Sequence, residues 1–82
     1  MITVHVKLFA SARDIAGKAE DALSLPEGSS ARDVLNSLIR AYPRLQPWEQ
    51  HLRIAVNQSY VGFDEPVRNH DEIAIIPPVS GG

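Results

Sequence analysis

Residues 30–43 read SARDVLNSLIRAYP and carry the longest helical pattern in this chain of 82 residues. Ser29 or Ser30 is a suitable N-cap, and Ser30 with Asp33 has the spacing of a capping box. Apolar side chains then recur every three or four residues, as along one face of an α-helix: Ala31, Val34, Leu35, Leu38, Ile39 and Tyr42. The proline that follows disfavours helical geometry at the end of this pattern. We therefore predict one helix that is long enough to cover a sheet.

Alternating patterns typical of β-strands lie on both sides of this helix. Residues 2–10 come first, with one face made of Ile2, Val4, Val6, Leu8 and Ala10 and the other of Thr3, His5, Lys7 and Phe9. Residues 19–25 form a second predicted strand before the helix. After the helix, residues 52–57, 60–61 and 72–76 predict a third strand, a very short fourth strand and a last strand.

The connections between these elements carry turn and cap residues. Ser11 is placed to cap a short helical turn, which Gly17 would end in a left-handed conformation. Residues 44–51 predict a loop that Leu45 and Trp48 anchor to the edge of the core. The order of elements gives an α+β layer structure, with the helix packed across one face of the sheet. It matches the β-grasp, or ubiquitin-like, fold with a mixed sheet of four to five strands over residues 1–77.

Composition excludes several classes of function. The chain contains no cysteine, which rules out a disulfide scaffold, a cysteine-ligated zinc site and a thiol mechanism of its own. The formal net charge of −2 argues against binding to nucleic acid, for which a basic stripe is expected. We interpret His5, His51 and His70 as surface residues and predict no metal site. Neither a targeting segment nor an apolar run near 20 residues is visible, so we expect a cytoplasmic protein without contact to a membrane.

The carboxyl end differs from a frayed terminus. Residues 77–82 read Pro77-Pro78-Val79-Ser80-Gly81-Gly82 and contain no charged side chain. The prolines favour an extended exit from the sheet, and the glycines narrow the chain to its backbone. We predict an extended tail over residues 78–82, which would reach roughly 16 Å when extended. Such a tail suits insertion into the active site of another protein, where a terminal carboxylate becomes reactive once ATP has activated it.

The tail and the order of elements together resemble one family, the small subunit of molybdopterin synthase. The resemblance covers nearly the whole chain, and its marks are Leu8-Phe9-Ala10 followed by Arg13, Ala55-Val56-Asn57-Gln58, Asp71-Glu72-Ile73-Ala74 and the Pro-Pro-Val-Ser-Gly-Gly end. The segment Asn69-His70-Asp71 departs from the family, which often has a glycine in this turn. The resemblance implies a sulfur carrier of molybdenum-cofactor biosynthesis that is not an enzyme on its own.

The resemblance also implies a reaction cycle and its partners. An adenylating enzyme similar to ubiquitin-activating enzymes would use ATP to adenylate Gly82, so that the carrier itself keeps no cofactor. A sulfurtransferase would then supply the sulfur of a Gly82 thiocarboxylate. The tail, Pro77 to Gly82, would enter the large synthase subunit and donate sulfur to cyclic pyranopterin monophosphate. The family's usual assembly is a heterotetramer of two small and two large subunits.

A docking surface is predicted beside the tail. Phe9 lies on the polar side of the first strand, Ile76 lies on the outward side of the last strand, and Tyr60 lies between polar turns. Exposed apolar residues that cluster in this way mark interaction sites. Arg13 is a further candidate that would bind an acidic group of a partner, with a surface ion pair as the alternative.

Two other functions fit the same tail. A related carrier would supply thiamine synthesis or another sulfur pathway, and a ubiquitin-like modifier would form an isopeptide bond from Gly82 to a lysine of a target protein. A plain adaptor, in contrast, would not depend on its tail.

Overall fold

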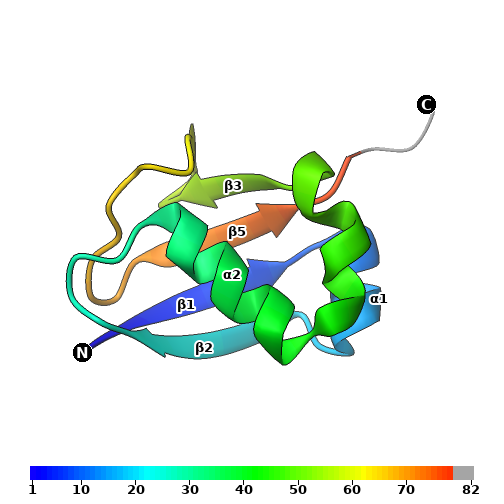
Figure 1. The fold of residues 1–82 in the computed structure, drawn as a ribbon, viewed down its shortest axis with the longest axis horizontal. Helices are drawn as coiled ribbons and strands as arrows, with labels where there is room; N and C mark the ends of the chain where they lie inside the picture. Colours follow the sequence, from blue (N-terminus) through cyan, green and yellow to red (C-terminus); the bar gives the residue numbers. More distant parts are fainter. Residues whose placement is uncertain (79–82) are drawn as a thin grey trace.

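A mixed five-stranded sheet forms the centre of the structure, a computed structural model that describes residues 1–78 (Figure 1). The elements follow in the order β1 (Ile2–Leu8), α1 (Ala10–Ala16), β2 (Glu20–Leu25), α2 (Ala31–Ala41), the 3₁₀-helix η1 (Pro43–His51), β3 (Arg53–Val56), β4 (Ser59–Val61) and β5 (Glu72–Ile76). The strand order across the sheet is β2-β1-β5-β3-β4, with β1 and β5 parallel and the other pairs antiparallel. This is the predicted β-grasp architecture.

The core lies between the sheet and α2. Every second residue of β1 points into the core, and the apolar stripe of α2 packs against these side chains. The buried residues of the two elements are Ile2, Val4, Val6 and Leu8 of β1 and Ala31, Val34, Leu35 and Leu38 of α2. The central strand β5 adds Ile73 and Ile75, which are completely buried. Burial of each large aliphatic side chain contributes about 1.5–3 kcal/mol. The helix stripe and the strand alternation of the sequence are thus confirmed.

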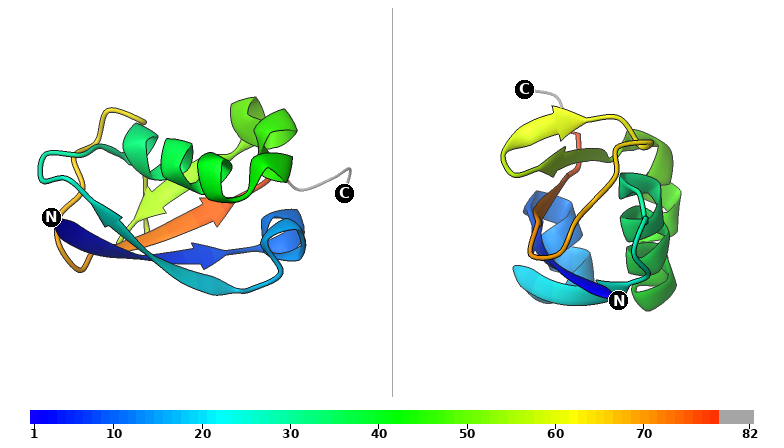
Figure 2. Two further views of the ribbon diagram at one scale, coloured as in Figure 1. Left: turned by 60° about the horizontal axis from the view of Figure 1, so that its bottom comes forward. Right: turned by 90° about the vertical axis from the view of Figure 1, so that its left-hand side faces the viewer.

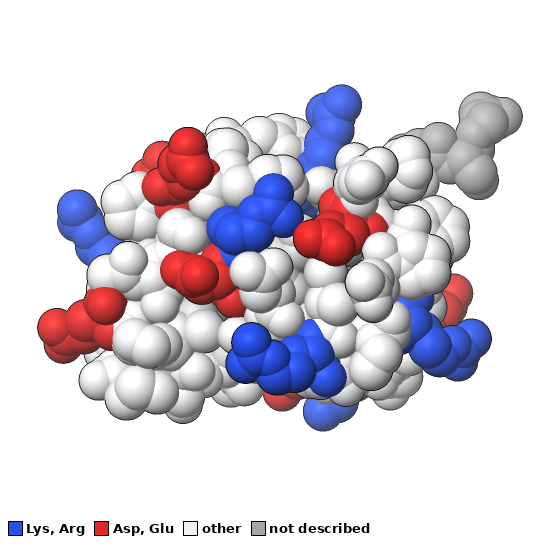
Figure 3. Space-filling model, in the orientation of Figure 1, with Lys and Arg blue, Asp and Glu red and all other residues white. Residues whose placement is uncertain are grey.

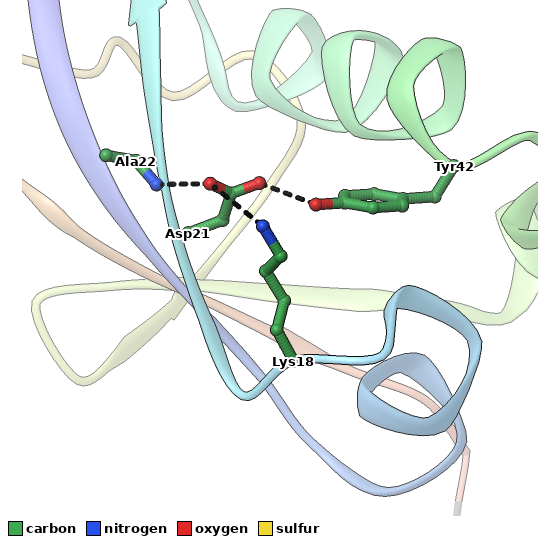
Figure 4. A network of polar contacts seen from close by, with 4 residues as sticks. All are labelled: Lys18, Asp21, Ala22 and Tyr42. Atoms are coloured by element: carbon green, nitrogen blue, oxygen red, sulfur yellow. Dashed lines mark hydrogen bonds and ion pairs between the residues drawn. The ribbon is translucent and has the colours of Figure 1, made fainter.

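The two ends of α2 are fixed by polar contacts. The backbone N–H of Ser30 donates to Asp33 Oδ2 at 2.8 Å, and the backbone N–H of Asp33 donates to Ser30 Oγ at 3.4 Å, which completes the predicted capping box. At the other end, Tyr42 donates its hydroxyl to Asp21 Oδ2 at 2.7 Å (Figure 4). Asp21 also accepts the backbone N–H of Ala22 at 2.8 Å and lies 3.9 Å from Lys18 Nζ. The carboxylate of Asp21 therefore joins the edge strand β2 to the end of α2.

The start of α1 differs from the sequence prediction. Strand β1 ends at Leu8, and Ala10 does not continue its buried face but is exposed at the first position of α1. Phe9, not Ser11, occupies the N-cap position, and its carbonyl accepts the N–H groups of Ala12 and Arg13. The chain turns two residues earlier than expected because Ala10 adopts a left-handed backbone with φ of 50°. The predicted C-cap is correct, since Gly17 is left-handed with φ of 76°.

Residues 44–51 are not the predicted loop. They belong to η1, which begins at Pro43, where the fixed φ of proline suits the first turn of a helix. Leu45 is completely buried, and Trp48 is half-buried against the core. Their spacing of three residues matches the period of a 3₁₀-helix, so the two predicted anchors are confirmed within a helix instead of a loop.

The helix-covered side of the molecule mixes both signs of charge. Lysine, arginine, aspartate and glutamate side chains are interspersed over α2 and its surroundings on this side (Figure 3). Arg32 of α2, for example, lies 3.3 Å from Glu49 of η1 and stacks 4.3 Å over the ring of Phe63. Within residues 1–78, no helix has the length and apolar character that a membrane span requires.

Candidate functional site

Within residues 1–78, one face of the sheet carries no helix. Helices α2 and η1 lie on the same side of the sheet, and α1 lies at one end of it, near the end of β5 (Figure 2). We call the opposite side the open face. It carries the strand residues that point away from the core, among them Thr3, His5 and Lys7 of β1. Polar residues of β1 are therefore available to solvent, as their alternation predicts.

Strand register brings distant residues together on the open face. Leu8 pairs with Ile75, so Phe9 and Ile76 come next to each other at the end of the parallel β1–β5 pair. Ala74 of β5 pairs with Ala55 of β3, which in turn pairs with Tyr60 of β4. The result is an apolar strip across four strands, which we call the exit patch: Phe9, Ala55, Tyr60, Ala74 and Ile76.

The exit patch exposes large apolar side chains. Phe9 is 46% exposed and Tyr60 is 64% exposed, and within residues 1–78 only Met1 is another strongly exposed large hydrophobic residue. Single exposed apolar residues are common in soluble proteins. Here two of them share one face with Ile76, which is itself half-buried. Exposed large apolar side chains that share one face of a sheet are typical of a binding site for another protein.

Arg53 adds a positive charge to this surface. It is exposed, and its Cα partner across the sheet is Ile76. Its guanidinium carbon lies 6.0 Å from the centroid of the Tyr60 ring, within the range of a cation–π interaction. Arg13, the arginine singled out from the sequence, lies elsewhere. It is exposed on α1 and lines a hollow with Asp14 and the turn that follows this helix.

The predicted tail begins directly after the exit patch. Strand β5 ends at Ile76, Pro77 is buried, and Pro78 is exposed. Pro77 thus belongs to the body of the domain, whereas Pro78 stands at its surface. The other predicted tail residues, Val79, Ser80, Gly81 and Gly82, lie outside the described residues. The site that the structure describes is therefore the surface around the start of the tail.

Charged and aromatic groups flank the exit patch on β1 and β5. Lys7 Nζ lies 3.4 Å from Glu72 Oε2, and both side chains remain well exposed. The imidazole rings of His5 and His70 stack with their centroids 6.4 Å apart. Within residues 1–78, no group of three or more histidine, aspartate or glutamate side chains has a geometry that would hold a metal ion. The three histidines lie at the surface, as the sequence predicts.

Asn57 fixes the hairpin that presents Tyr60. Its backbone is left-handed with φ of 50°, and the next residue, Gln58, is left-handed with φ of 74°, as the tight turn between β3 and β4 requires. The side-chain carbonyl of Asn57 accepts the N–H of Glu72 at 3.0 Å, and its amide donates to Asp71 Oδ1 at 3.0 Å. The turn is therefore tied to the start of β5.

The turn before β5 contains no glycine, whereas the family that the sequence resembles often has one there. His70 takes a left-handed backbone here, with φ of 70°, in the place where a glycine would be free of strain. Two hydrogen bonds hold the turn: His70 N–H donates to the carbonyl of Thr3 at 2.7 Å, and Asn69 Oδ1 accepts the N–H of Thr3 at 2.8 Å. The turn is therefore hydrogen-bonded to β1 even though it has no glycine.

Three of the four residues that the sequence proposed for docking share one face of the sheet. Phe9, Tyr60 and Ile76 lie on the open face, but Arg13 lies on α1 outside it. Arg53 was not singled out from the sequence. The alternation around Ile54 places Arg53 outward, but its proximity to Ile76 depends on the long-range pairing of β3 with β5.

Comparison with known proteins gives consistent matches. Residues 6–82 match the ThiS family model. A protein of Arabidopsis thaliana named "Molybdopterin synthase sulfur carrier subunit" is 36% identical over 81 residues, which cover 99% of this chain and 84% of that protein. Among solved structures, a putative molybdopterin converting factor subunit 1 from Pyrococcus furiosus has a TM-score of 0.87 and 31% identity and covers 96% of this chain and 100% of that one. The small archaeal modifier protein 1 from Methanosarcina acetivorans has a TM-score of 0.82 and 36% identity, over 100% of this chain and 98% of that one.

Proposed function

The chain belongs to the ThiS family, and on that premise we propose that it is the sulfur-carrier subunit of a molybdopterin synthase. The observation that carries the proposal is its similarity, over 99% of its length, to a protein named as the sulfur carrier subunit of that enzyme. The exit patch supports it, because a carrier subunit requires a surface beside its tail that a larger subunit can cover.

The proposed chemistry takes place at Gly82. Its carboxylate attacks the α-phosphate of ATP in the active site of an adenylating enzyme, which forms an acyl-adenylate and releases pyrophosphate. A sulfide-equivalent group supplied by a sulfurtransferase then displaces AMP and leaves a thiocarboxylate. Splitting a difficult substitution into two steps through an activated acyl group is the usual logic of covalent catalysis. The carrier holds no cofactor in this scheme, because ATP is bound by the adenylating enzyme.

Sulfur transfer takes place in the large subunit. The thiocarboxylate sulfur attacks an oxygen-bearing carbon of cyclic pyranopterin monophosphate and displaces that oxygen, which forms a thioester between carrier and pterin. Water then cleaves the acyl–sulfur bond, which regenerates the Gly82 carboxylate and leaves the sulfur on the pterin. A dithiolene contains two sulfur atoms, so two loaded carriers are consumed for each product. A heterotetramer of two small and two large subunits would supply them. In this proposal the carrier is not an enzyme on its own and acts in the cytoplasm.

The exit patch is the proposed contact with the large subunit. Phe9, Tyr60 and Ile76 would be covered by that subunit, and Pro78 would direct the following residues into its active site. The narrow Gly81-Gly82 end fits a channel that is only wide enough for a polypeptide backbone. The sheet fixes the direction in which the chain leaves the domain at Pro78.

Deletion of Gly82 tests this proposal. The variant keeps residues 1–78 unchanged, so it should unfold at the same temperature as the wild type and still bind the large subunit, but it should form no thiocarboxylate. The readouts are intact mass after incubation with the adenylating enzyme, ATP and a sulfur donor, and conversion of the pterin precursor by the purified complex. Unimpaired conversion by the shortened carrier would refute the proposal.

A second function is favoured by a specific similarity. The chain is 36% identical, over its whole length, to the small archaeal modifier protein 1 from Methanosarcina acetivorans. As a protein modifier, this chain would use the same adenylated Gly82, but a lysine amine of a target would displace AMP. Intact mass separates the two functions. A carrier gains only the difference between one sulfur and one oxygen atom, whereas a modifier is found in conjugates heavier than the chain itself.

A further inference from the structure

Arg53 places a fixed positive charge at the edge of the exit patch. Its register partner Ile76 is the last residue of β5, so the guanidinium stands beside the point where the tail leaves the domain. The Tyr60 ring on the neighbouring strand lies 6.0 Å from the guanidinium carbon, within the range of a cation–π interaction. An arginine held in this way loses less conformational freedom when it binds a ligand.

This guanidinium has no acidic partner among residues 1–78. The ion pairs formed there join Lys7 to Glu72, Lys18 to Asp21 and Arg32 to Glu49. Arg53 lies instead beside Ile76, its register partner, and the ring of Tyr60. An exposed guanidinium is well hydrated, but the same group becomes strongly unfavourable when a partner covers it without supplying an anion.

A hollow beside Arg53 provides space for a side chain of a partner. It has a volume of about 290 Å³ and opens next to Arg53 and Tyr60 at the edge strand β4. Its remaining walls are aliphatic or aromatic: Leu52, Ile54, Val61 and Phe63. A side chain that combines an apolar stem with a charged end fits these surroundings.

We propose that the protein which covers the exit patch presents an aspartate or glutamate carboxylate to Arg53. This inference rests on the proposed function, in which that protein is the large synthase subunit, and it adds the chemistry of the contact. A carboxylate accepts two parallel N–H groups from a guanidinium, which fixes orientation as well as charge. The pair would set the angle at which the tail enters the partner.

The surrounding charges favour a protein carboxylate over a nucleic acid. Glu72 and Glu20 also lie on the open face. Lys7 is next to both of them, since it forms an ion pair with Glu72 and is the register partner of Glu20. A nucleic-acid backbone would be repelled by these carboxylates and would require several cations in a row. A single arginine within an apolar strip matches one acidic side chain.

Arg53→Glu tests the inference in the complete chain. The dissociation constant of the complex with the purified large subunit is measured by calorimetry at low and at high salt. We expect Arg53→Ala to weaken binding roughly tenfold and Arg53→Glu to weaken it more, because the reversed charge repels the carboxylate of the partner. Arg53→Ala should also reduce the salt dependence of binding, whereas Arg53→Lys should have an intermediate affinity.

Arg40→Glu is the matched control. It makes the same change of charge on an exposed arginine of α2, which covers the opposite side of the sheet. Its affinity should stay within about twofold of the wild type, since exposed charges outside an interface contribute little. Circular dichroism and thermal unfolding confirm that each variant is folded.

The outcomes separate this inference from the function on which it rests. If Arg53→Glu binds as tightly as Arg40→Glu while the wild-type complex still converts the pterin precursor, the carboxylate contact is wrong and the carrier function stands. If the wild-type chain does not bind the large subunit, both are wrong. If Arg53→Glu weakens binding and Arg40→Glu does not, the inference is supported.

Discussion

The hydrogen bond from Tyr42 to Asp21 offers a sharp test of how the helix is attached to the sheet. Tyr42→Phe removes only the hydroxyl that donates to Asp21 Oδ2 at 2.7 Å. A hydrogen bond to a charged group contributes about 1.5–3 kcal/mol when it is buried. The Asp21 side chain is 25% exposed, so water replaces part of the lost bond. We therefore expect the free energy of unfolding to fall by about 1 kcal/mol at pH 7.

The pH dependence of this effect follows from the pKa of Asp21. The hydrogen bond from Tyr42 lowers that pKa below its ordinary value of 3.8, helped by the N–H of Ala22 and the charge of Lys18 and opposed by partial burial. A carboxyl with a lowered folded-state pKa stabilises the protein above its ordinary pKa and loses this contribution as pH falls through the folded-state value. The difference between the wild type and Tyr42→Phe should thus be constant from pH 7 to about 5 and narrow below pH 3.8.

Urea unfolding followed by circular dichroism measures this difference at each pH. With a urea m-value near 1 kcal/mol/M, the lower end for small proteins, the midpoint should fall by about 1 M at pH 7. Asp21→Asn provides the control, since it removes the titrating group and should make the effect of Tyr42→Phe nearly independent of pH. An unchanged midpoint at pH 7, or an equal difference at pH 7 and pH 3, would show that this contact does not hold α2 to β2.

Three further substitutions test the core, the helix cap and the docking surface. Leu38→Ala empties a completely buried position of α2 and should lower the free energy of unfolding by about 2–5 kcal/mol, which chemical denaturation measures. Ser30→Ala removes the capping box and should cost about 1 kcal/mol, seen as a thermal midpoint roughly 4–8 °C lower; an unchanged midpoint would mean that water replaces the cap. Phe9→Ala should leave the thermal midpoint nearly unchanged because Phe9 is 46% exposed. It should weaken binding to the large subunit roughly tenfold, and equal affinity in a titration would remove Phe9 from the interface.

The elements with a strong period were predictable from the sequence. The stripe of α2 and the alternation of β1 correspond to burial in the structure, because each pattern has one face that must leave water. The last strand was placed correctly at Glu72–Ile76, where alternation ends at two prolines that cannot donate hydrogen bonds to a sheet. In these segments local pattern and tertiary burial agree.

The elements that were missed depend on backbone geometry or distant contacts. Ala10 enters a left-handed conformation that its residue type does not favour, so the start of α1 is not visible in the sequence. The helix η1 contains Pro47, so its sequence is typical of a loop, and only the burial of Leu45 in the structure indicates otherwise. Arg53 was overlooked for a related reason, because its neighbour Ile76 is brought to it only by strand register.

The division of the sheet into two faces separates stability from recognition. Side chains on the face toward α2 are buried, so changes there alter the free energy of folding, as Leu38 and Ile75 illustrate. Side chains of the open face, such as Tyr60 and Arg53, remain largely in water, and their replacement removes little buried surface. Relatives of one fold can therefore vary the open face to suit different partners while the direction of β5 stays constant. By this reasoning a charge reversal at Arg53 alters the choice of partner without loss of the fold.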